Sequence, residues 1–204
     1  MLRVGLTGGI ACGKSTVARM LVSRGVHFLQ ADTLAHELYA PRTGVYNEVV
    51  RHFGREILNE DGSINRHRLA NRAFPDRIGE LNAIVHPAVI RAQNQWMDEM
   101  ARKDPHGIAV VEAALIVEAG AAKDFDKLIV VTCDFQRKVE RFAGRAGIPL
   151  DAARTEVERR SAAQLSDEDK ARQADYVIDN SGSLEETEGQ VEKIWSKLQK
   201  LASP

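Results

Sequence analysis

The sequence predicts an α/β fold in which about five parallel strands form a doubly wound sheet. The expected strands, such as residues 107–112 and 127–133, are almost continuously apolar, which is typical of parallel strands buried on both faces. Between them lie segments whose apolar residues recur at helical spacing. Strand and helix therefore alternate along most of the chain, as in open α/β sheets.

The first expected strand leads into a glycine-rich loop and a helix, and the last leads into a helix with Trp195 on its core side. Strands are expected at residues 2–7, 26–30, 107–112, 127–133 and 174–179, and helices at residues 16–22, 34–39, 45–53, 66–74, 75–85, 88–100, 135–145, 151–172 and 184–201.

Residues 41–103 form an almost entirely helical block. The block is too long for one crossover between adjacent strands, so we expect an inserted helical subdomain that offers a place for a substrate pocket. Within it, His86-Pro87 is expected to break the helical pattern, with a long helix following.

Composition excludes several classes of protein. The chain has 204 residues, 44% of them apolar and 28% charged, which suits one sizeable globular domain. Its net charge of -1 gives no bulk electrostatic argument for binding nucleic acid or a membrane surface, and no apolar run approaches the roughly 18 residues of a membrane helix. We expect no signal peptide, because the N-terminal residues lead directly into the glycine-rich loop. Two cysteines suit a reducing cytoplasm better than a disulfide framework. The sequence leaves open a monomer or a small homo-oligomer.

Gly8–Ser15 fits the pattern G-x-x-x-x-G-K-[ST], and it stands between an expected strand and an expected helix. Glycines allow backbone N–H groups to turn inward around an anion, and the following helix directs its positive end to the same point. Lys14 is expected to reach the β- and γ-phosphates, and the Ser15 hydroxyl to hold Mg²⁺. The expected ATP-binding residues of this loop are Gly9, Ile10, Ala11, Cys12, Gly13, Lys14, Ser15 and Thr16.

Two acids follow expected strands. Asp32 lies just past the second strand, where ligands bind in open α/β sheets, although Asp32 or Thr33 could instead cap the helix that follows. Glu112 ends the third strand, a usual place for a carboxylate near the Mg²⁺ shell.

With these elements placed, nearly the whole chain resembles the dephospho-CoA kinase family. Each motif is short, but their order and spacing together are specific. The segments that carry the resemblance are Gly5–Ile10, Gly13–Ala18, Gln30–Asp32, Phe53–Gly54, Ile57–Leu58, Asp61–Gly62, Arg66, Leu69, His86–Pro87, Leu115–Glu118, Arg141, Arg145 and Ala174–Gly182.

The resemblance implies a P-loop NTPase-type kinase that uses Mg²⁺ and transfers the γ-phosphate of ATP to the ribose 3′-hydroxyl of dephospho-CoA. The products are CoA and ADP, and the reaction is the last step of CoA synthesis. Residues 1–204 would form one kinase domain. Its parts would be a nucleotide-binding core at residues 1–33, 104–140 and 173–204, a helical CoA-binding insertion at about 34–103, and a lid at about 141–172.

The resemblance also implies residue roles. Asp32 would orient the 3′-hydroxyl and accept its proton. Lid residues Arg141 and Arg145 lie four apart on one helix face, and their guanidinium groups suit phosphates. The alternative is a solvated basic face, which is the weaker interpretation for both and weaker still for Arg141. The remaining implied contacts are Arg66, His86 and Glu118 with the acceptor and Asn180 with ATP; the plainer alternatives are an exposed arginine, an interior histidine, a helix cap and a turn asparagine.

Some residues depart from the family pattern. Gln30 replaces the first Asp of Asp-Ala-Asp, and Glu112-Ala113-Ala114 replaces Asp-(apolar)-Pro. Ala11-Cys12 replaces the commoner Gly-Ser, and Ala11 should be tolerated if its φ is negative. Because Cys12 lies in a nest of N–H groups at a helix N-terminus, we expect a thiolate that is alkylated faster than Cys133 and is protected by ATP.

Three other functions fit the loop alone. A P-loop GTPase would need Asn-Lys-x-Asp after a strand, which Thr132–Phe135 does not supply. A kinase of a nucleoside or a nucleoside monophosphate differs only in its acceptor region, and a non-catalytic ATP-binding module would keep Lys14 without needing Asp32.

Overall fold

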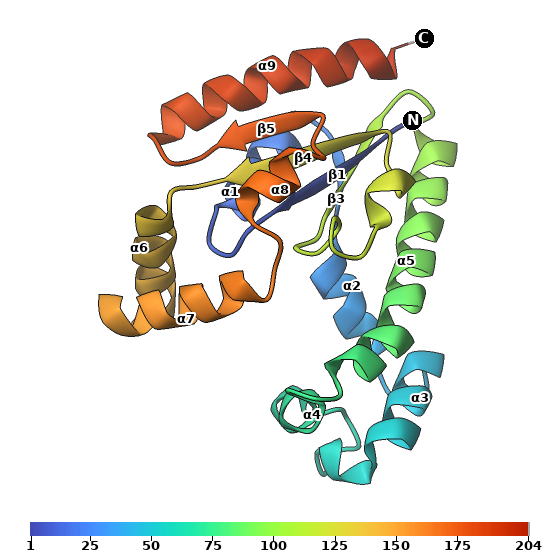
Figure 1. Cartoon of the computed structure of the whole chain (residues 1–204). Helices are drawn as coiled ribbons and strands as arrows, with labels where there is room; N and C mark the ends of the chain where they lie inside the picture. The colour runs from blue at the N-terminus through green and yellow to red at the C-terminus, as the bar shows by residue number, and fades with distance from the viewer. Residues whose placement is uncertain (204) are drawn as a thin grey trace. The chain divides into compact units, whose positions relative to one another are not determined.

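The computed structural model describes residues 1–203, apart from the side chain of Ala35. Pro204, the last residue of the expected nucleotide-binding core, lies outside the described residues. The chain divides into two compact units, Met1–Leu29 with Met100–Pro204 and Gln30–Glu99. Each unit is described by itself below, with the element labels of Figure 1.

The first unit is built on a five-stranded sheet with the order β2-β3-β1-β4-β5. Strand β1 pairs in parallel with β3 and with β4, and β4 pairs in parallel with β5, which confirms the predicted α/β class. The elements are β1 (Leu2–Gly8), α1 (Lys14–Val22), β2 (His27–Gln30), β3 (Ile108–Glu112), η2 (Ala121–Asp124), β4 (Lys127–Thr132), α6 (Phe135–Ala146), α7 (Leu150–Ala162), α8 (Asp167–Ala171), β5 (Tyr176–Asp179) and α9 (Leu184–Ala202).

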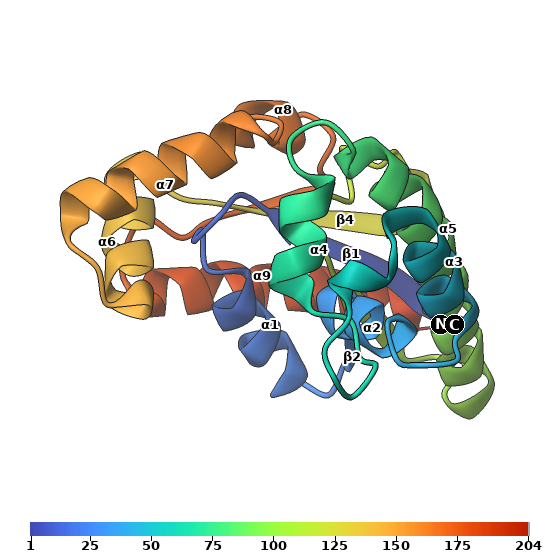
Figure 2. The same ribbon diagram turned by 90° about the horizontal axis from the view of Figure 1, so that it is seen from below.

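Helices cover both faces of this sheet, which is why its central strands are apolar throughout. Figure 2 shows α1 and α9 on one side of the strands and α8 on the other. The core between the sheet and these two longer helices contains alternate residues of β1 and β4 together with apolar residues of α1 and α9, and Trp195 packs against it as expected. Its fully buried members include Val4, Leu6, Val17, Leu21, Ile129, Val131, Ile178, Val191 and Leu198.

The segment expected as one helix at residues 151–172 is instead two helices, α7 and α8. Ser166 ends the continuity because its hydroxyl oxygen accepts a hydrogen bond from the Asp169 N–H at 3.0 Å and so caps a new helix. Ahead of it, the backbone N–H of Leu165 donates to the Glu118 carboxylate instead of to a helical carbonyl. Side-chain acceptors in this segment compete with the helical hydrogen bonds, which the charge pattern alone did not reveal.

The second unit is helical and has its own apolar core. Phe53 and Ile57 are almost completely buried in it, and Thr43 caps α3 by accepting from the Tyr46 N–H at 3.0 Å. The elements are α2 (Ala31–Leu38), α3 (Gly44–Phe53), η1 (Arg55–Ile57), α4 (Arg66–Ala73) and most of α5 (Ile78–Lys103).

The expected break at His86-Pro87 is wrong, since α5 runs through Pro87 without interruption. Proline removes one backbone N–H from the helical ladder. The apolar face nevertheless continues across it, because Leu81, Val85 and Ala88 are all buried in the core of this unit. Burial of that face outweighs the loss of one hydrogen bond.

Replacing Phe53 with Ala should lower the free energy of unfolding of the helical unit by about 3–5 kcal/mol, because it leaves a cavity in the core. The side chain of Phe53 is 1% exposed, whereas that of Phe74, in the same unit, is 58% exposed, so Phe74→Ala is the matched control. Urea titrations in a Trp195→Phe background would follow Trp96 alone, one of the two tryptophans of the chain. Equal effects of the two substitutions would contradict the proposed core.

Candidate active site

The glycine-rich loop joins the central strand β1 to α1, as the sequence predicts. Strand β1 ends at Gly8 and α1 begins at Lys14, with Gly13 as its N-cap in the left-handed conformation at φ 93°. The first N–H groups of the helix therefore face the loop, and together with the helix dipole they form an anion-binding site. Within the loop, the backbone N–H of Cys12 donates to the Gly9 carbonyl at 3.5 Å.

The carbonyl oxygen of Cys12 is the anchor of this loop. It accepts a hydrogen bond from Asn180 Nδ2 at 2.8 Å and a longer one from Arg141 Nη1 at 3.4 Å. The amide oxygen of Asn180 in turn accepts from the Thr187 hydroxyl at 2.8 Å, and both side chains are buried. A side chain at Gly13 would overlap Asn180 Nδ2, so glycine is required there for space as well as for its positive φ.

Asn180, expected to contact ATP, thus anchors the loop at the Cys12 carbonyl. One of its amide hydrogens and its amide oxygen are already engaged in hydrogen bonds within the protein. Thr187 was missed by sequence analysis, because nothing in the helical pattern of residues 184–201 marks one threonine as a partner of the loop. The family resemblance predicted Asn180 near the nucleotide; the structure joins its side chain to the glycine-rich loop, and a contact with ATP stays a prediction.

The Lys14 side chain folds over the loop, where its Nζ donates to the carbonyls of Gly8 and Gly9 at 3.0 and 3.1 Å. Ser15 is exposed in the first turn of α1. Thr16, also in that turn, accepts a hydrogen bond from Arg19 Nη2 at 3.3 Å through its hydroxyl. The ammonium of Lys14 and the hydroxyl of Ser15 are therefore presented on the side of the helix N-terminus.

Ala11 has a φ of 53°, so the condition set for tolerating alanine there is not met. The left-handed conformation raises the free energy of a residue with a Cβ atom by roughly 1–2 kcal/mol. The glycine that is commoner at this position would not have this strain. Ile10 and Ala11 pack against the apolar cluster of α6 and α7, which includes Val139 and Phe142. Contact with this helical pair offsets the strain and ties the loop to the region expected as a lid.

The side chain of Cys12 points into the apolar core. It is fully buried between the sheet and α1. Burial raises the pKa of the Cys12 thiol, and the nearby Lys14 charge offsets part of the shift. Burial raises the pKa of Cys133 as well. The expected thiolate at Cys12 is therefore wrong, because the side chain is buried in the core, where the neutral thiol is favoured.

The two lid arginines have different surroundings. Arg141 reaches the loop and also donates to Cys133 Sγ at 3.3 Å. Arg145, one turn further along α6, lies over the ring of Phe142 at 5.4 Å, and Arg160 of α7 lies over the same ring at 5.4 Å. Arg145 is exposed, so its role at ATP stays a prediction.

Glu118 connects the segment after β3 to the region around α8. Its Oε1 lies 2.9 Å from the ammonium of Lys170, which is completely buried and also donates to the Ala114 carbonyl at 3.2 Å. The same oxygen accepts from the Leu165 N–H at 3.1 Å. Oε2 is buried without a hydrogen-bond partner among the residues described. Glu118 thus has a positioning role, and a contact with the acceptor stays a prediction.

Glu112, expected near the Mg²⁺ shell, ends β3 and pairs in register with Leu6 of β1. It is buried beside the strand that carries the loop. The next residue, Ala113, donates its N–H to the Leu6 carbonyl at 3.1 Å, so this segment continues alongside β1 past the acid.

The other expected residues belong to the helical unit. Asp32 is an exposed side chain in the first turn of α2, and the N-cap of that helix is Gln30, so the alternative that Asp32 or Thr33 caps the helix is wrong. Arg66 begins α4, and its Nη1 lies 2.7 Å from Nε2 of His36. His86 is half-buried within α5. The alternative of an ordinary interior histidine stays open for it.

The model of the dephospho-CoA kinase family matches residues 2–186. A dephospho-CoA kinase from Geobacter metallireducens is 43% identical over 199 residues, which cover 97% of this chain and 96% of that protein. One from Aquifex aeolicus is 41% identical over 200 residues, covering 97% and 98%. A crystal structure from Thermus thermophilus is similar with a TM-score of 0.79 at 32% identity, covering 97% of both chains.

A parallel sheet with a glycine-rich G-x-x-x-x-G-K-[ST] loop between its central strand and a helix defines a nucleotide-binding protein of the P-loop class. Within that class, the family matches over almost the full length identify an ATP-dependent kinase. The chain belongs to the dephospho-CoA kinase family, whose activity is the final step of coenzyme A biosynthesis.

Because the Cys12 thiol is buried with a raised pKa, iodoacetamide at pH 8 should label it far more slowly in the folded protein than in urea. The rate in the folded protein should rise only as the pH passes above the ordinary thiol range, and ATP should change it little. Mass spectrometry of the Cys12 and Cys133 peptides measures both sites in one sample. Labelling of Cys12 at the unfolded rate would contradict this burial.

Proposed function

We propose that the loop, Lys14 and Arg141 together bind the phosphates of ATP and neutralise the charge that develops on the transferred γ-phosphoryl group. Phosphoryl transfer depends on positioning and charge stabilisation more than on covalent chemistry. The observation that carries this proposal is the loop itself: Lys14 folds over it at 3.0 Å, while Arg141 and Asn180 fix its Cys12 carbonyl. When ATP binds, oxygens of one of its phosphates would replace the carbonyl oxygens of Gly8 and Gly9 as the hydrogen-bond acceptors of the Lys14 ammonium.

A magnesium ion fits this site if it arrives with the nucleotide. The described residues contain no cluster of three or more His, Cys, Asp or Glu side chains that could hold a metal. Mg²⁺ in phosphotransferases is usually bound through one or two protein oxygens and the phosphates, so a preformed cage is not needed. Ser15 would supply its exposed hydroxyl, with Glu112 near the strand end. When bound, the ion neutralises charge on the β- and γ-phosphates.

We assign recognition of dephospho-CoA to the helical unit. Asp32 would orient the ribose 3′-hydroxyl and accept its proton as the γ-phosphoryl group is transferred. Its carboxylate is exposed and not committed to capping α2, which leaves it available for this role. Arg66 suits the acceptor's phosphates, and His86 is the further acceptor contact proposed in this unit. Glu118, which belongs to the first unit, is proposed as an acceptor contact as well.

The helical region around residues 141–172 would act as a lid, because Arg141 and the packing of Ile10 and Ala11 connect it to the loop that binds ATP. Arg145 would join the site on closure.

The two cysteines, both free thiols, suit the reducing cytoplasm, where we place the protein. No helix within residues 1–203 is both long and apolar enough to span a membrane.

A direct assay tests the function. The protein is incubated with ATP, Mg²⁺ and dephospho-CoA, and the product is identified by mass, with adenosine and AMP as control acceptors. We expect CoA and ADP with dephospho-CoA and little turnover with either control. Preferred phosphorylation of AMP or adenosine, or no CoA from folded protein, would overturn the proposed acceptor.

Replacing Asp32 with Asn should lower turnover by roughly 10²-fold or more, because the 3′-hydroxyl loses its proton acceptor. ATP binding, measured by calorimetry, should be unchanged. Glu37→Gln is the matched control, since Glu37 is another exposed acid of the same helix. Near-normal turnover of the Asp32 variant would show that this carboxylate is dispensable.

A further inference from the structure

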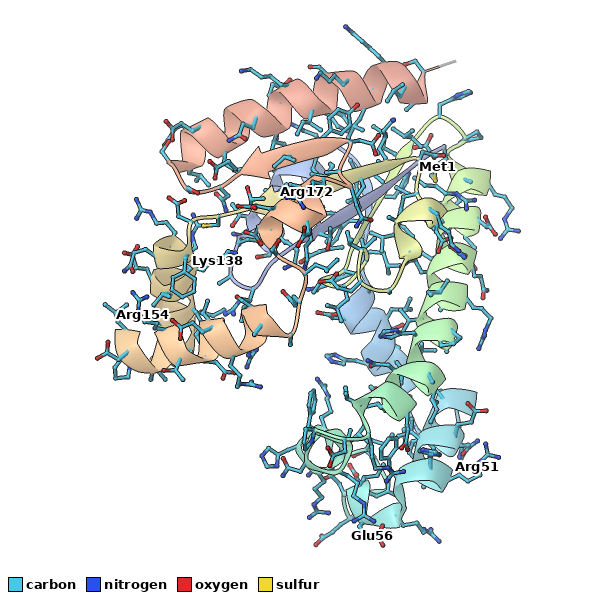
Figure 3. The ribbon with its side chains drawn as sticks, in the orientation of Figure 1. Met1, Arg51, Glu56, Lys138, Arg154 and Arg172 are labelled. Atoms are coloured by element: carbon cyan, nitrogen blue, oxygen red, sulfur yellow. The ribbon has the colours of Figure 1, made fainter. Side chains whose placement is uncertain are left out.

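An ion pair with no role in the scheme above lies against the phosphate-binding loop. Lys138, in α6, and Asp167, the first residue of α8, approach to 2.6 Å between Nζ and Oδ2. Lys138 is 8% exposed, and Figure 3 labels it near the start of α6, whereas the Asp167 side chain is partly exposed. A buried charge is costly unless it is paired, so the Lys138 ammonium depends on Asp167 while the loop carries no phosphate.

The position of this pair is set by Gly9. A Cβ atom built on Gly9 would lie 2.7 Å from Asp167 Oδ1 and 3.2 Å from Lys138 Nζ. The carboxylate and the ammonium therefore both rest on the bare backbone of the loop, and a side chain at Gly9 would displace them. Gly9 also accepts a hydrogen bond from Lys14 through its carbonyl, so the two ammonium groups serve the same part of the loop.

Lys138 and Arg141 are three residues apart in α6 and thus share one helix face. Arg141 reaches the loop at the Cys12 carbonyl, and Lys138 reaches it at Gly9. Helix α6 therefore presents two cations to the loop, one at each end. The environment of Cys12 agrees with this, because its raised pKa, caused mainly by burial, also responds to the charges of Lys14, Asp167 and Lys138.

We propose that Lys138 binds a phosphate of ATP and that Asp167 holds its ammonium over the loop until the nucleotide arrives. The proposal rests on ATP binding at this loop. A phosphate and the Asp167 carboxylate are both anions and would occupy the same few ångströms above Gly9, so they repel each other. Binding of ATP then exchanges one anion for the other at Lys138, and the ammonium remains paired throughout.

A purely structural ion pair between α6 and α8 makes a different prediction. Losing either partner would then disturb the same contact, so both variants would change ATP affinity in the same direction or leave it unchanged. If Asp167 competes with phosphate for Lys138, the two substitutions act in opposite directions. The sign of the change therefore separates the two roles.

The test is calorimetric titration of ATP into the full chain and three variants. Lys138→Met should weaken ATP binding by roughly tenfold or more, the loss expected for one charge-assisted hydrogen bond. Asp167→Asn should strengthen it by roughly fivefold, because a competing negative charge is removed. If Lys138→Met alone fails to fold, the variant that combines Lys138→Met with Asp167→Asn provides the same test. That double variant should bind ATP more weakly than Asp167→Asn alone.

Asp175→Asn is the matched control, because Asp175 also pairs with a lysine, Lys127, at 2.8 Å but does so at the opposite end of β4 from the loop. Its ATP affinity should equal that of the unaltered protein. Shifts of the same sign in the Lys138 and Asp167 variants, or none, would overturn the inference while leaving the proposed function intact. Failure of the unaltered protein to bind ATP would overturn both.

Discussion

One backbone carbonyl, that of Cys12, determines the form of the phosphate-binding loop. Asn180 and Arg141 both donate to it, and Thr187 fixes the amide of Asn180. These contacts fix the orientation of the Cys12 peptide directly before Gly13, the N-cap of α1. This arrangement requires glycine at position 13, because no larger residue fits beside Asn180.

Helix α6 makes further contacts with the same loop. It contributes Arg141 and Lys138 on one face and the apolar residues that receive Ile10 and Ala11 on another. The same helix therefore supplies packing that stabilises a strained alanine and cations that suit phosphate. A movement of α6 would alter both together, which couples the nucleotide site to the helical pair α6–α7 through direct contacts.

The sequence predicted the fold well because its signals were local. Continuous apolar strands and the motif between β1 and α1 needed no long-range information, and the family resemblance singled out Asn180 and Arg141, both of which contact the loop. Pro87 and the break before Asp167 were predicted wrongly, since burial across a proline and a cap at Ser166 depend on tertiary partners. The inward turn of Cys12 and the pairing of Lys138 also depend on such partners, so residue type and spacing could not reveal them.

The anchoring hydrogen bond joins residues 168 positions apart in the sequence. During synthesis the glycine-rich motif emerges first, but the amide that shapes it emerges with the last strand, and the hydroxyl that orients that amide follows in α9. Strand β1 likewise cannot be paired on both sides until β3 and β4 have been synthesised, because it lies between them in the sheet. The nascent chain therefore carries its nucleotide motif long before the Asn180 and Thr187 side chains that hold the loop in place have been synthesised.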